Sequence, residues 1–151
     1  MLSKKTKYAL QSLLYLAKKY DKGPVIISDM AKCECLPQKF LEAILLELKK
    51  DGFLHSKKGK GGGYYLAKPP KDIILGHVIR LLNGPLAPIA CVSQTAYKRC
   101  EDCKDENSCG IRMIMKDVRD AIANILDNTS LADLLDRVKK VTEKETSMYF
   151  I

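Results

Sequence analysis

Apolar positions in the first third of the chain recur with the spacing of helices and are interrupted at glycine and proline. Apolar side chains follow one another at three- and four-residue intervals over residues 4–20 and 37–50, which places them on one face of a helix. A shorter helix is predicted between them over residues 29–34, after the break at Gly23-Pro24. Only residues 35–36 separate this helix from the next. Two helices with so short a connection are typical of a helix–turn–helix.

A hairpin is predicted directly after the helix–turn–helix. Residues 53–57 and 63–67 have strand-like composition, and the turn between them is rich in glycine and lysine. Glycine permits positive φ and close approach of the backbone, and lysines on such a turn direct their charges outward. A β-ribbon of this kind can lie along a polyanion. The pattern therefore predicts a mainly α-helical protein with a small β-hairpin, organised around a winged helix-turn-helix DNA-binding domain.

The rest of the chain is predicted to hold three more helices and a long loop. Apolar spacing predicts helices over residues 75–82, over 109–126 and from Ser130 to about residue 140. Residues 86–108 show little periodicity, and the polar segment after residue 140 is expected to be loose. The expected organisation is a winged helix-turn-helix domain over 1–83 with its wing at about 53–67, a cysteine-bearing sensor loop over 84–108, a dimerisation helix and C-terminal helix over 109–140, and a tail over 141–151.

The predicted helix over residues 109–126 carries a stripe of isoleucine, methionine and valine along its length. The preceding domain has a core of its own, and the remaining chain is too short to cover this stripe. Pairing with the same helix of a second copy would cover it, and a two-fold dimer matches a palindromic DNA site. The sequence therefore predicts a homodimer.

Positive charge is concentrated in the part of the chain that contains the predicted wing. The formal net charge is +8; residues 1–68 hold 14 lysines or arginines against 6 acidic residues, whereas residues 69–151 hold 12 of each. This asymmetry favours a polyanionic partner, double-stranded operator DNA. No run approaches the ~18 apolar residues of a membrane span, and no small-residue cleavage site follows the N-terminal apolar run. A cytoplasmic protein without a membrane partner is expected.

Two groups of residues are candidates for contact with DNA. The outward face of the predicted recognition helix begins with Gln38, Lys39 and Glu42, whose side chains suit adenine, phosphate and the cytosine amino group respectively. A merely solvated helix face is the alternative. In the wing, lysine charges suit phosphate or minor-groove contact, and the adjoining glycines and the charge asymmetry favour this over a solvated cluster. The candidates in the wing are Lys57, Lys58, Lys60, Gly61 and Gly62.

Six cysteines, in a chain expected to lack a secretory leader, indicate metal or thiol chemistry rather than a disulfide framework. The candidate ligands are Cys91, Cys100, Cys103 and Cys109, the last at a predicted helix start whose dipole favours a thiolate. Four cysteine sulfurs suit an iron–sulfur cluster or tetrahedral zinc, and the spacing does not choose between them. A metal-free thiol switch or an inert loop would also fit this spacing. One or both of the cysteines at residues 33 and 35 are interpreted as small buried hydrophobes.

Several short motifs along the chain match a known pattern. They are Lys7-Tyr8-Ala9-Leu10, Phe40-Leu41-Glu42-Ala43-Ile44-Leu45, Gly59-Lys60-Gly61-Gly62-Gly63-Tyr64, Leu66-Ala67-Lys68-Pro69, Gly76, Val78, Ile79, Arg80 and Thr129-Ser130-Leu131-Ala132-Asp133-Leu134. Together they resemble the Rrf-two type of bacterial winged-helix transcriptional regulators, over roughly residues 1–137, and the wing motif is the most specific part. The resemblance implies a homodimer that binds operator DNA and receives its signal through the segment between the wing and the long helix.

The cluster-binding members of this family imply an iron–sulfur cluster in the sensor loop, held by three cysteines and one non-cysteine ligand. This chain departs from that pattern: the gap after Cys91 is longer, Cys103 is an additional candidate, and Arg112 stands where such members have a histidine ligand.

The prediction is therefore a bacterial transcriptional regulator, a repressor, that senses redox, iron–sulfur or nitric oxide status through a cysteine-ligated metal centre. One alternative is a metal-free regulator of the same family that responds to a partner protein or small molecule. Another is a zinc-stabilised DNA-binding module. An enzyme is not expected, because His55 and His77 lie far in sequence from the cysteine segment and no βαβ pattern appears.

Overall fold

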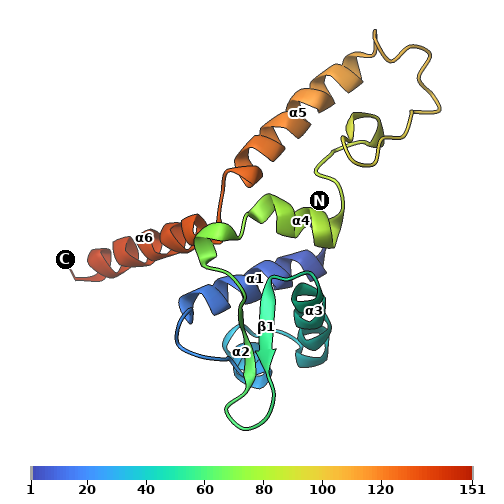
Figure 1. The fold of residues 1–151 in the computed structure, drawn as a ribbon. Helices are drawn as coiled ribbons and strands as arrows, with labels where there is room; N and C mark the ends of the chain where they lie inside the picture. The colour runs from blue at the N-terminus through green and yellow to red at the C-terminus, as the bar shows by residue number, and fades with distance from the viewer. Residues whose placement is uncertain (1, 151) are drawn as a thin grey trace. The chain divides into compact units, whose positions relative to one another are not determined.

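A computed structural model describes residues 2–150, and Figure 1 shows its fold. The chain forms two compact units: the first comprises the described residues up to Ile73 and from Ser130 onward, and the second is Ile74–Thr129. In chain order the elements are α1 (Lys4–Lys18), α2 (Ile27–Cys33), α3 (Gln38–Lys50), β1 (Leu54–Lys57), β2 (Gly63–Leu66), the 3-10 helix η1 (Pro70–Asp72), α4 (Leu75–Asn83), the 3-10 helix η2 (Ala90–Val92), α5 (Gly110–Asp127) and α6 (Leu131–Tyr149).

The first unit is a winged helix-turn-helix. Within it α1 packs against α3, β2 and α6, and α2 packs against α3. β1 and β2 pair antiparallel, with Leu54 opposite Leu66 and Lys57 opposite Gly63. The predicted fold class, mainly helical with one small hairpin, is therefore confirmed. Its fully buried side chains include Leu13, Met30, Leu45, Leu48, Leu54 and Leu131.

Capping groups explain where the main helices of this unit begin and end. Ser3 Oγ accepts a hydrogen bond from the backbone N–H of Thr6 at 3.1 Å, which caps α1. Gly52 follows the C-cap of α3 with φ +81°, a left-handed conformation that glycine adopts without steric cost. At the start of α6, Ser130 and Asp133 form a capping box in which each side chain accepts from the other residue's N–H.

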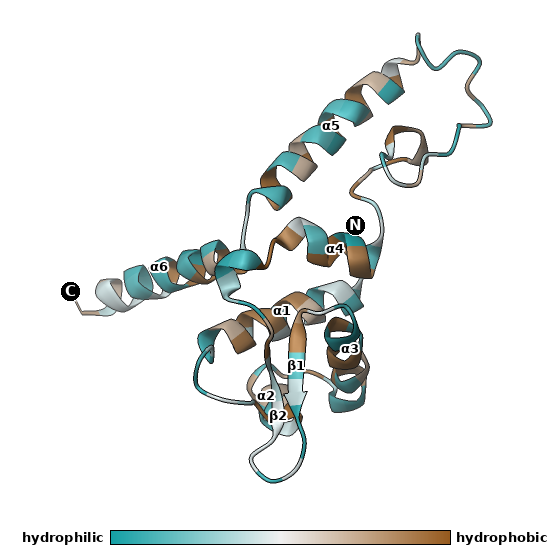
Figure 2. Ribbon diagram, in the orientation of Figure 1, coloured by the Kyte–Doolittle hydropathy of each residue, from teal (hydrophilic) through white to brown (hydrophobic). Residues whose placement is uncertain are grey.

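The second unit contains α4, η2 and α5, and α5 packs against both of the others. Apolar and polar residues alternate along α5, as the colours of Figure 2 show. No residue of α5 is buried. The segment predicted to be a loop contains one element, the single 3-10 turn of η2.

The last helix is longer than the sequence pattern suggests. The tail expected after residue 140 is helical as far as Tyr149. Residues 141–149 contain neither glycine nor proline, and the hydroxyls of Thr142 and Thr146 donate to the carbonyls one turn earlier, at 3.0 and 2.9 Å. Within residues 2–150, no helix is long and apolar enough to cross a membrane.

Candidate nucleic-acid interface

An open groove lies between α3 and the hairpin of the first unit. Its volume is about 470 Å³. Five of the residues predicted to contact DNA line it together: Gln38 and Glu42 from α3, and Lys57, Lys58 and Gly62 from the hairpin. The remaining three candidates, Lys39, Lys60 and Gly61, are exposed on the same two elements but do not line the groove.

The apolar stripe of α3 determines which of its residues face outward. Leu41, Leu45 and Leu48 are almost completely buried against the rest of the unit. Gln38 and Glu42, one turn apart on the same side of the helix, lie beside this buried stripe and are exposed to solvent. Gln38 Nε2 donates to Glu42 Oε1 at 3.3 Å. The two polar side chains are thus held side by side in the groove.

The turn of the hairpin requires glycine at two positions. A Cβ on Gly62 would lie 2.2 Å from the carbonyl oxygen of Lys57, and a Cβ on Gly63 would lie 2.2 Å from that of Val25. Both distances are far below van der Waals contact, so a side chain at either position would force the neighbouring backbone to shift. The Gly62 N–H closes the turn by donating to the Gly59 carbonyl at 3.0 Å. The glycines therefore set the shape of the tip that carries the lysines.

The hairpin is also tied to the segment before α2. Val25 N donates to the carbonyl of Tyr64 at 2.8 Å, and Tyr64 N donates to the carbonyl of Val25 at 2.9 Å. This pair of hydrogen bonds forms an antiparallel bridge beside β2. It restrains β2 close to the turn, while the side chains of Lys57, Lys58 and Lys60 remain exposed to solvent. Three cations are therefore presented on a restrained ribbon.

The groove is also lined by residues that are not among the predicted DNA contacts. Lys49, Ser56 and Tyr64 line it with the predicted residues. Lys49 stands seven positions after Glu42, which is two helical turns, so helical spacing alone indicates that the two share a face. The polar Ser56 and Tyr64 face each other across the strand pair, a relationship that follows only from the register.

The cysteine segment of the second unit is only partly assembled. Partial burial and the neighbouring thiols of Cys109 and Cys100 raise the pKa of Cys103. Cys91 is buried in η2, whereas Cys100 is exposed. Within residues 2–150, no three His, Cys, Asp or Glu side chains converge closely enough to hold a metal ion. In this arrangement the four predicted ligands do not fit a four-thiolate site.

Two arginines of α5 hold the η2 segment through its backbone. Arg112 Nε donates to the Cys91 carbonyl at 3.3 Å, and Arg119 Nη1 donates to the Val92 carbonyl at 2.6 Å. Arg112, which replaces the histidine expected of a cluster ligand set, therefore binds the backbone of a candidate ligand.

The interpretation of Cys33 and Cys35 as buried hydrophobes is wrong. Both side chains are exposed. Cys35 lies in the turn between α2 and α3 and has a φ of +54°. The backbone turns away from the core at this position, so the Cys35 side chain is directed to solvent. Cys33 lies at the end of α2, outside its buried face of Met30 and Ala31. Its neighbouring thiol and partial burial raise the pKa of the Tyr15 phenol.

The apolar stripe of α5 is open to solvent in the single chain. Ile111, Ile114 and Ile125 are 68%, 54% and 60% exposed, and Met113 is 55% exposed. Exposed apolar patches of this extent on a helix are typical of protein–protein contact surfaces.

Known proteins resemble this chain over almost its whole length. Residues 2–137 match the Rrf2 family model, described as an iron-dependent transcriptional regulator. An rrf2-like HTH-type transcriptional regulator of Rhodobacter capsulatus is 38% identical over 138 residues, which is 89% of this chain and 92% of the relative. The HTH-type transcriptional regulator CymR of Bacillus subtilis is 31% identical over 150 residues, 99% of each.

Solved structures agree with these sequence matches. The structure of CymR, the global cysteine regulator of B. subtilis, matches with a TM-score of 0.76 and 31% identity, covering 91% of this chain and 97% of that one. IscR of T. potens matches with a TM-score of 0.74 and 28% identity, covering 93% and 90%. This chain is therefore similar to both in sequence and in fold.

Proposed function

The chain belongs to the Rrf2 family of transcriptional regulators, and we propose that it is a repressor that binds operator DNA as a homodimer through α3 and the hairpin. Family membership makes it a DNA-binding regulator rather than an enzyme. The observation that carries the proposal is the groove in which Gln38 and Glu42 lie beside Lys57 and Lys58.

In this proposal α3 enters the major groove with its first turn. Gln38 can make two hydrogen bonds to an adenine, and Glu42 can accept from a cytosine amino group. Binding exchanges the hydrogen bond between these two side chains for bonds to the base edges. Lys39 lies on the exposed side of the same turn and meets phosphate.

The hairpin acts as the wing, and its lysines contact phosphates. Lys57 and Lys58 line the groove, while Lys60 extends beyond it. Gly61 and Gly62 have no side chain to hold the DNA backbone away. Each neutralised phosphate releases condensed counterions, so binding through these lysines weakens steeply as salt rises.

We infer that the homodimer forms through the exposed apolar stripe of α5. An unpaired amphipathic helix of this kind is stabilised when a second copy covers it. A two-fold dimer would place two copies of α3 on successive half-sites of a palindrome. Ile111, Ile114 and Ile125 are each more than half exposed, so their burial in the dimer would contribute favourable hydrophobic free energy.

The cysteine segment is proposed as the sensor. Its thiols suit an iron–sulfur cluster, with zinc or a metal-free thiol response as alternatives. The described arrangement does not gather four ligands. The segment is joined to the proposed dimer helix by two hydrogen bonds, from Arg112 to the Cys91 carbonyl and from Arg119 to the Val92 carbonyl.

The DNA-binding proposal is tested by salt dependence. A duplex selected from a random pool is titrated by fluorescence anisotropy at several salt concentrations, for the unmodified protein and for the Lys57→Gln/Lys58→Gln/Lys60→Gln variant. If the dimer neutralises six or more phosphates, its affinity falls by about a thousandfold or more between 50 and 200 mM salt, and the variant has a shallower slope.

The control carries Lys139→Gln, Lys140→Gln and Lys144→Gln, which remove the same charge from exposed positions of α6. It is expected to keep the slope of the unmodified protein. Equal slopes for all three proteins would overturn the assignment of the wing.

The sensor proposal is tested separately by anaerobic purification. Visible absorption with iron and acid-labile sulfide in stoichiometric amounts supports a cluster, and stoichiometric zinc without response to oxidants or nitric oxide supports a structural zinc site. A metal-free protein that still binds the selected duplex supports the regulator that responds to a partner or small molecule.

A further inference from the structure

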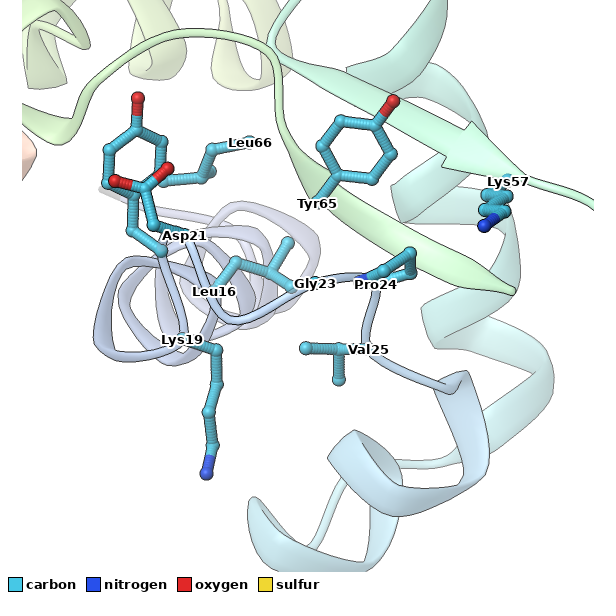
Figure 3. Close-up of a pocket in the computed structure, with 10 residues that line it drawn as sticks. Leu16, Lys19, Asp21, Gly23, Pro24, Val25, Lys57, Tyr65 and Leu66 are labelled. Carbon is cyan, nitrogen blue, oxygen red and sulfur yellow. The ribbon is translucent and has the colours of Figure 1, made fainter. Parts of the chain in front are cut away.

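A second hollow in the first unit lies behind the wing, between α1 and β2. Its volume is about 400 Å³, which falls within the range of small-molecule sites. The end of α1 and the turn after it form one side, the segment Gly23-Pro24-Val25 forms another, and β2 supplies Tyr65 and Leu66. Figure 3 shows these side chains around the hollow.

The floor of this hollow is apolar. Leu16 and Leu66 are 2% and 5% exposed and form part of the core, and Pro24 and Val25 extend the apolar lining towards the mouth. Tyr65 adds an aromatic ring whose other neighbour is His55, at 5.7 Å between ring centroids. A ligand with an apolar body would therefore bury surface on a preformed platform.

Two opposite charges stand at opposite sides of the hollow. Figure 3 places the carboxylate of Asp21 on one side of the view and Lys57 on the other. Neither forms an ion pair with another residue of the part of the chain described, 2–150. The amine of Lys19, another lining residue, lies 6.0 Å from the centroid of the Tyr15 ring, and Figure 3 shows this side chain extending away from Asp21 and Lys57.

Lys57 belongs to both hollows of this unit. It lines the groove proposed to hold DNA as well as the hollow behind the wing. Val25 adds a second connection, because this lining residue is hydrogen-bonded in both directions to Tyr64 of β2. An occupant behind the wing would therefore compete for a cation of the DNA-binding face.

We propose that the hollow behind the wing binds a short zwitterionic ligand with an apolar body, of which an apolar dipeptide or tripeptide is the simplest example. Its amino group pairs with Asp21, its carboxylate pairs with Lys57, and its side chains lie on Leu16, Leu66 and Tyr65. Because the ligand takes the ammonium group of Lys57, it weakens DNA binding, and DNA weakens ligand binding by the same factor. This regulatory step rests on the proposed function; the binding site itself does not.

Ligand binding is tested on the full chain without DNA. Leucyl-leucine and trileucine are titrated while the backbone amide and methyl NMR signals are followed. Shifts of Leu16, Val25 and Leu66 are expected, with N-acetyl-leucyl-leucine and leucyl-leucine amide binding at least about tenfold more weakly because each lacks one charged end. Absence of saturable shifts at these residues with either peptide overturns the site.

Three single variants separate the two hollows. Asp21→Asn alters only the ligand site and is expected to weaken peptide binding while leaving DNA affinity unchanged. Lys58→Gln alters only the groove and is expected to weaken DNA binding while leaving peptide binding unchanged. Lys57→Gln is expected to weaken both, and to remove the difference between leucyl-leucine and its amide.

The coupling is read from DNA titrations with saturating peptide. The salt slope is expected to fall by about 0.9 for each subunit that loses the Lys57 phosphate contact. An unchanged slope, with peptide shifts present, overturns the regulatory step. If the protein binds the peptide but binds no duplex from the random pool, the proposed function is contradicted. The proposed ligand site is supported in that case.

Discussion

Arg80 and Asp127 form an ion pair with two hydrogen bonds in the second unit. Arg80 Nη1 and Nη2 donate to Asp127 Oδ1 and Oδ2 at 2.6 and 2.8 Å. The pair joins α4 to the last residue of α5, across 47 positions of sequence. Gly76 makes room for it, because a Cβ there would lie 2.0 Å from Asp127 Oδ1. A glycine and two charged residues thus fasten the two helices that border the cysteine segment.

This pair predicts a specific pH dependence of stability. The hydrogen bonds from Arg80 lower the pKa of Asp127. A carboxylate with a lowered folded-state pKa stabilises the fold above its unfolded pKa of about 3.9, and that contribution is lost as pH falls through the folded value. Asp127→Asn is expected to cost about 1 kcal/mol at pH 7, since both side chains are about one-third exposed and screened. Below about pH 4 it is expected to cost less.

Urea unfolding of both proteins at pH 7 and near pH 3 measures this difference. Asp117→Asn, on the exposed part of α5, is the matched control and should alter stability by less than about 0.5 kcal/mol at either pH. A cost of Asp127→Asn that grows as the pH is lowered would contradict the assigned sign.

Gly76→Ala tests the same ion pair by filling the space that the Asp127 carboxylate occupies. The new methyl group displaces the carboxylate of Asp127, so the variant is expected to lose about 1–3 kcal/mol of unfolding free energy. In the double variant Gly76→Ala/Asp127→Asn, the two losses should be less than additive, because they remove one shared interaction. Additive losses in the four-protein cycle would show that the methyl group acts elsewhere.

Glycine at the wing turn is expected to be essential for DNA binding. Gly62→Ala places a Cβ against the Lys57 carbonyl, so the turn must open and the lysines must move. We expect at least about a tenfold loss of DNA affinity, corresponding to about 1.4 kcal/mol, with little change in helical content by circular dichroism. Gly110→Ala, where a Cβ meets nothing within 4 Å, should bind DNA normally.

Glu42 and Lys39 of α3 should differ in their effect on sequence preference. Glu42→Ala is expected to relax selection at one base pair, by about 1–3 kcal/mol. Lys39→Ala should weaken binding equally for all sequences and reduce the salt slope by about 0.9 for each subunit, or about 1.8 for the dimer. Selection of duplexes from a random pool by each variant measures both effects. An unchanged base preference for Glu42→Ala would show that Glu42 does not contact a base.

The exposed stripe of α5 should control oligomeric state. Ile114→Glu and Ile125→Glu together place two charges on the proposed contact surface, so a monomer is expected by light scattering at micromolar concentration. Lys116→Glu introduces a negative charge at a position of the same helix outside the stripe and should leave the dimer intact. Monomeric unmodified protein would contradict the proposal directly.

The two groups of cysteines should separate in metal content. Cys103→Ser and Cys109→Ser are expected to lower the metal content of anaerobically purified protein if the segment over residues 91–109 holds the centre. Cys33→Ser/Cys35→Ser should leave it unchanged, because these thiols lie in the other unit. If only Cys33→Ser/Cys35→Ser loses metal, the metal centre lies in the helix–turn–helix and not in the segment over residues 91–109.

The local elements could be predicted because their signals are local. The apolar period of α3, the break at Gly52, the capping box at Ser130 and the glycine-rich turn of the wing each depend on residues within a few positions of one another. The family motifs agree with them, and the match over residues 2–137 confirms the family. The helical end of α6 escapes prediction because its polar composition is typical of a loose segment, although its residues contain no helix breaker.

Other features depend on contacts between distant segments. The hydrogen bonds between Val25 and Tyr64, the place of Lys57 in two hollows, and the contact of Gly76 with Asp127 join residues far apart in the chain. Exposure of Cys33 and Cys35 likewise follows from how the turn leaves the core.

The helix–turn–helix, the basic wing and the surplus of positive charge beside it can all be derived from the order of residues, because periodicity, turn chemistry and charge are properties of neighbouring residues. Three-dimensional packing establishes which of these side chains share a groove, which thiols are neighbours and which glycine accommodates an ion pair. Those relationships are distances between segments, and side-chain spacing along one element carries no information about the packing of another.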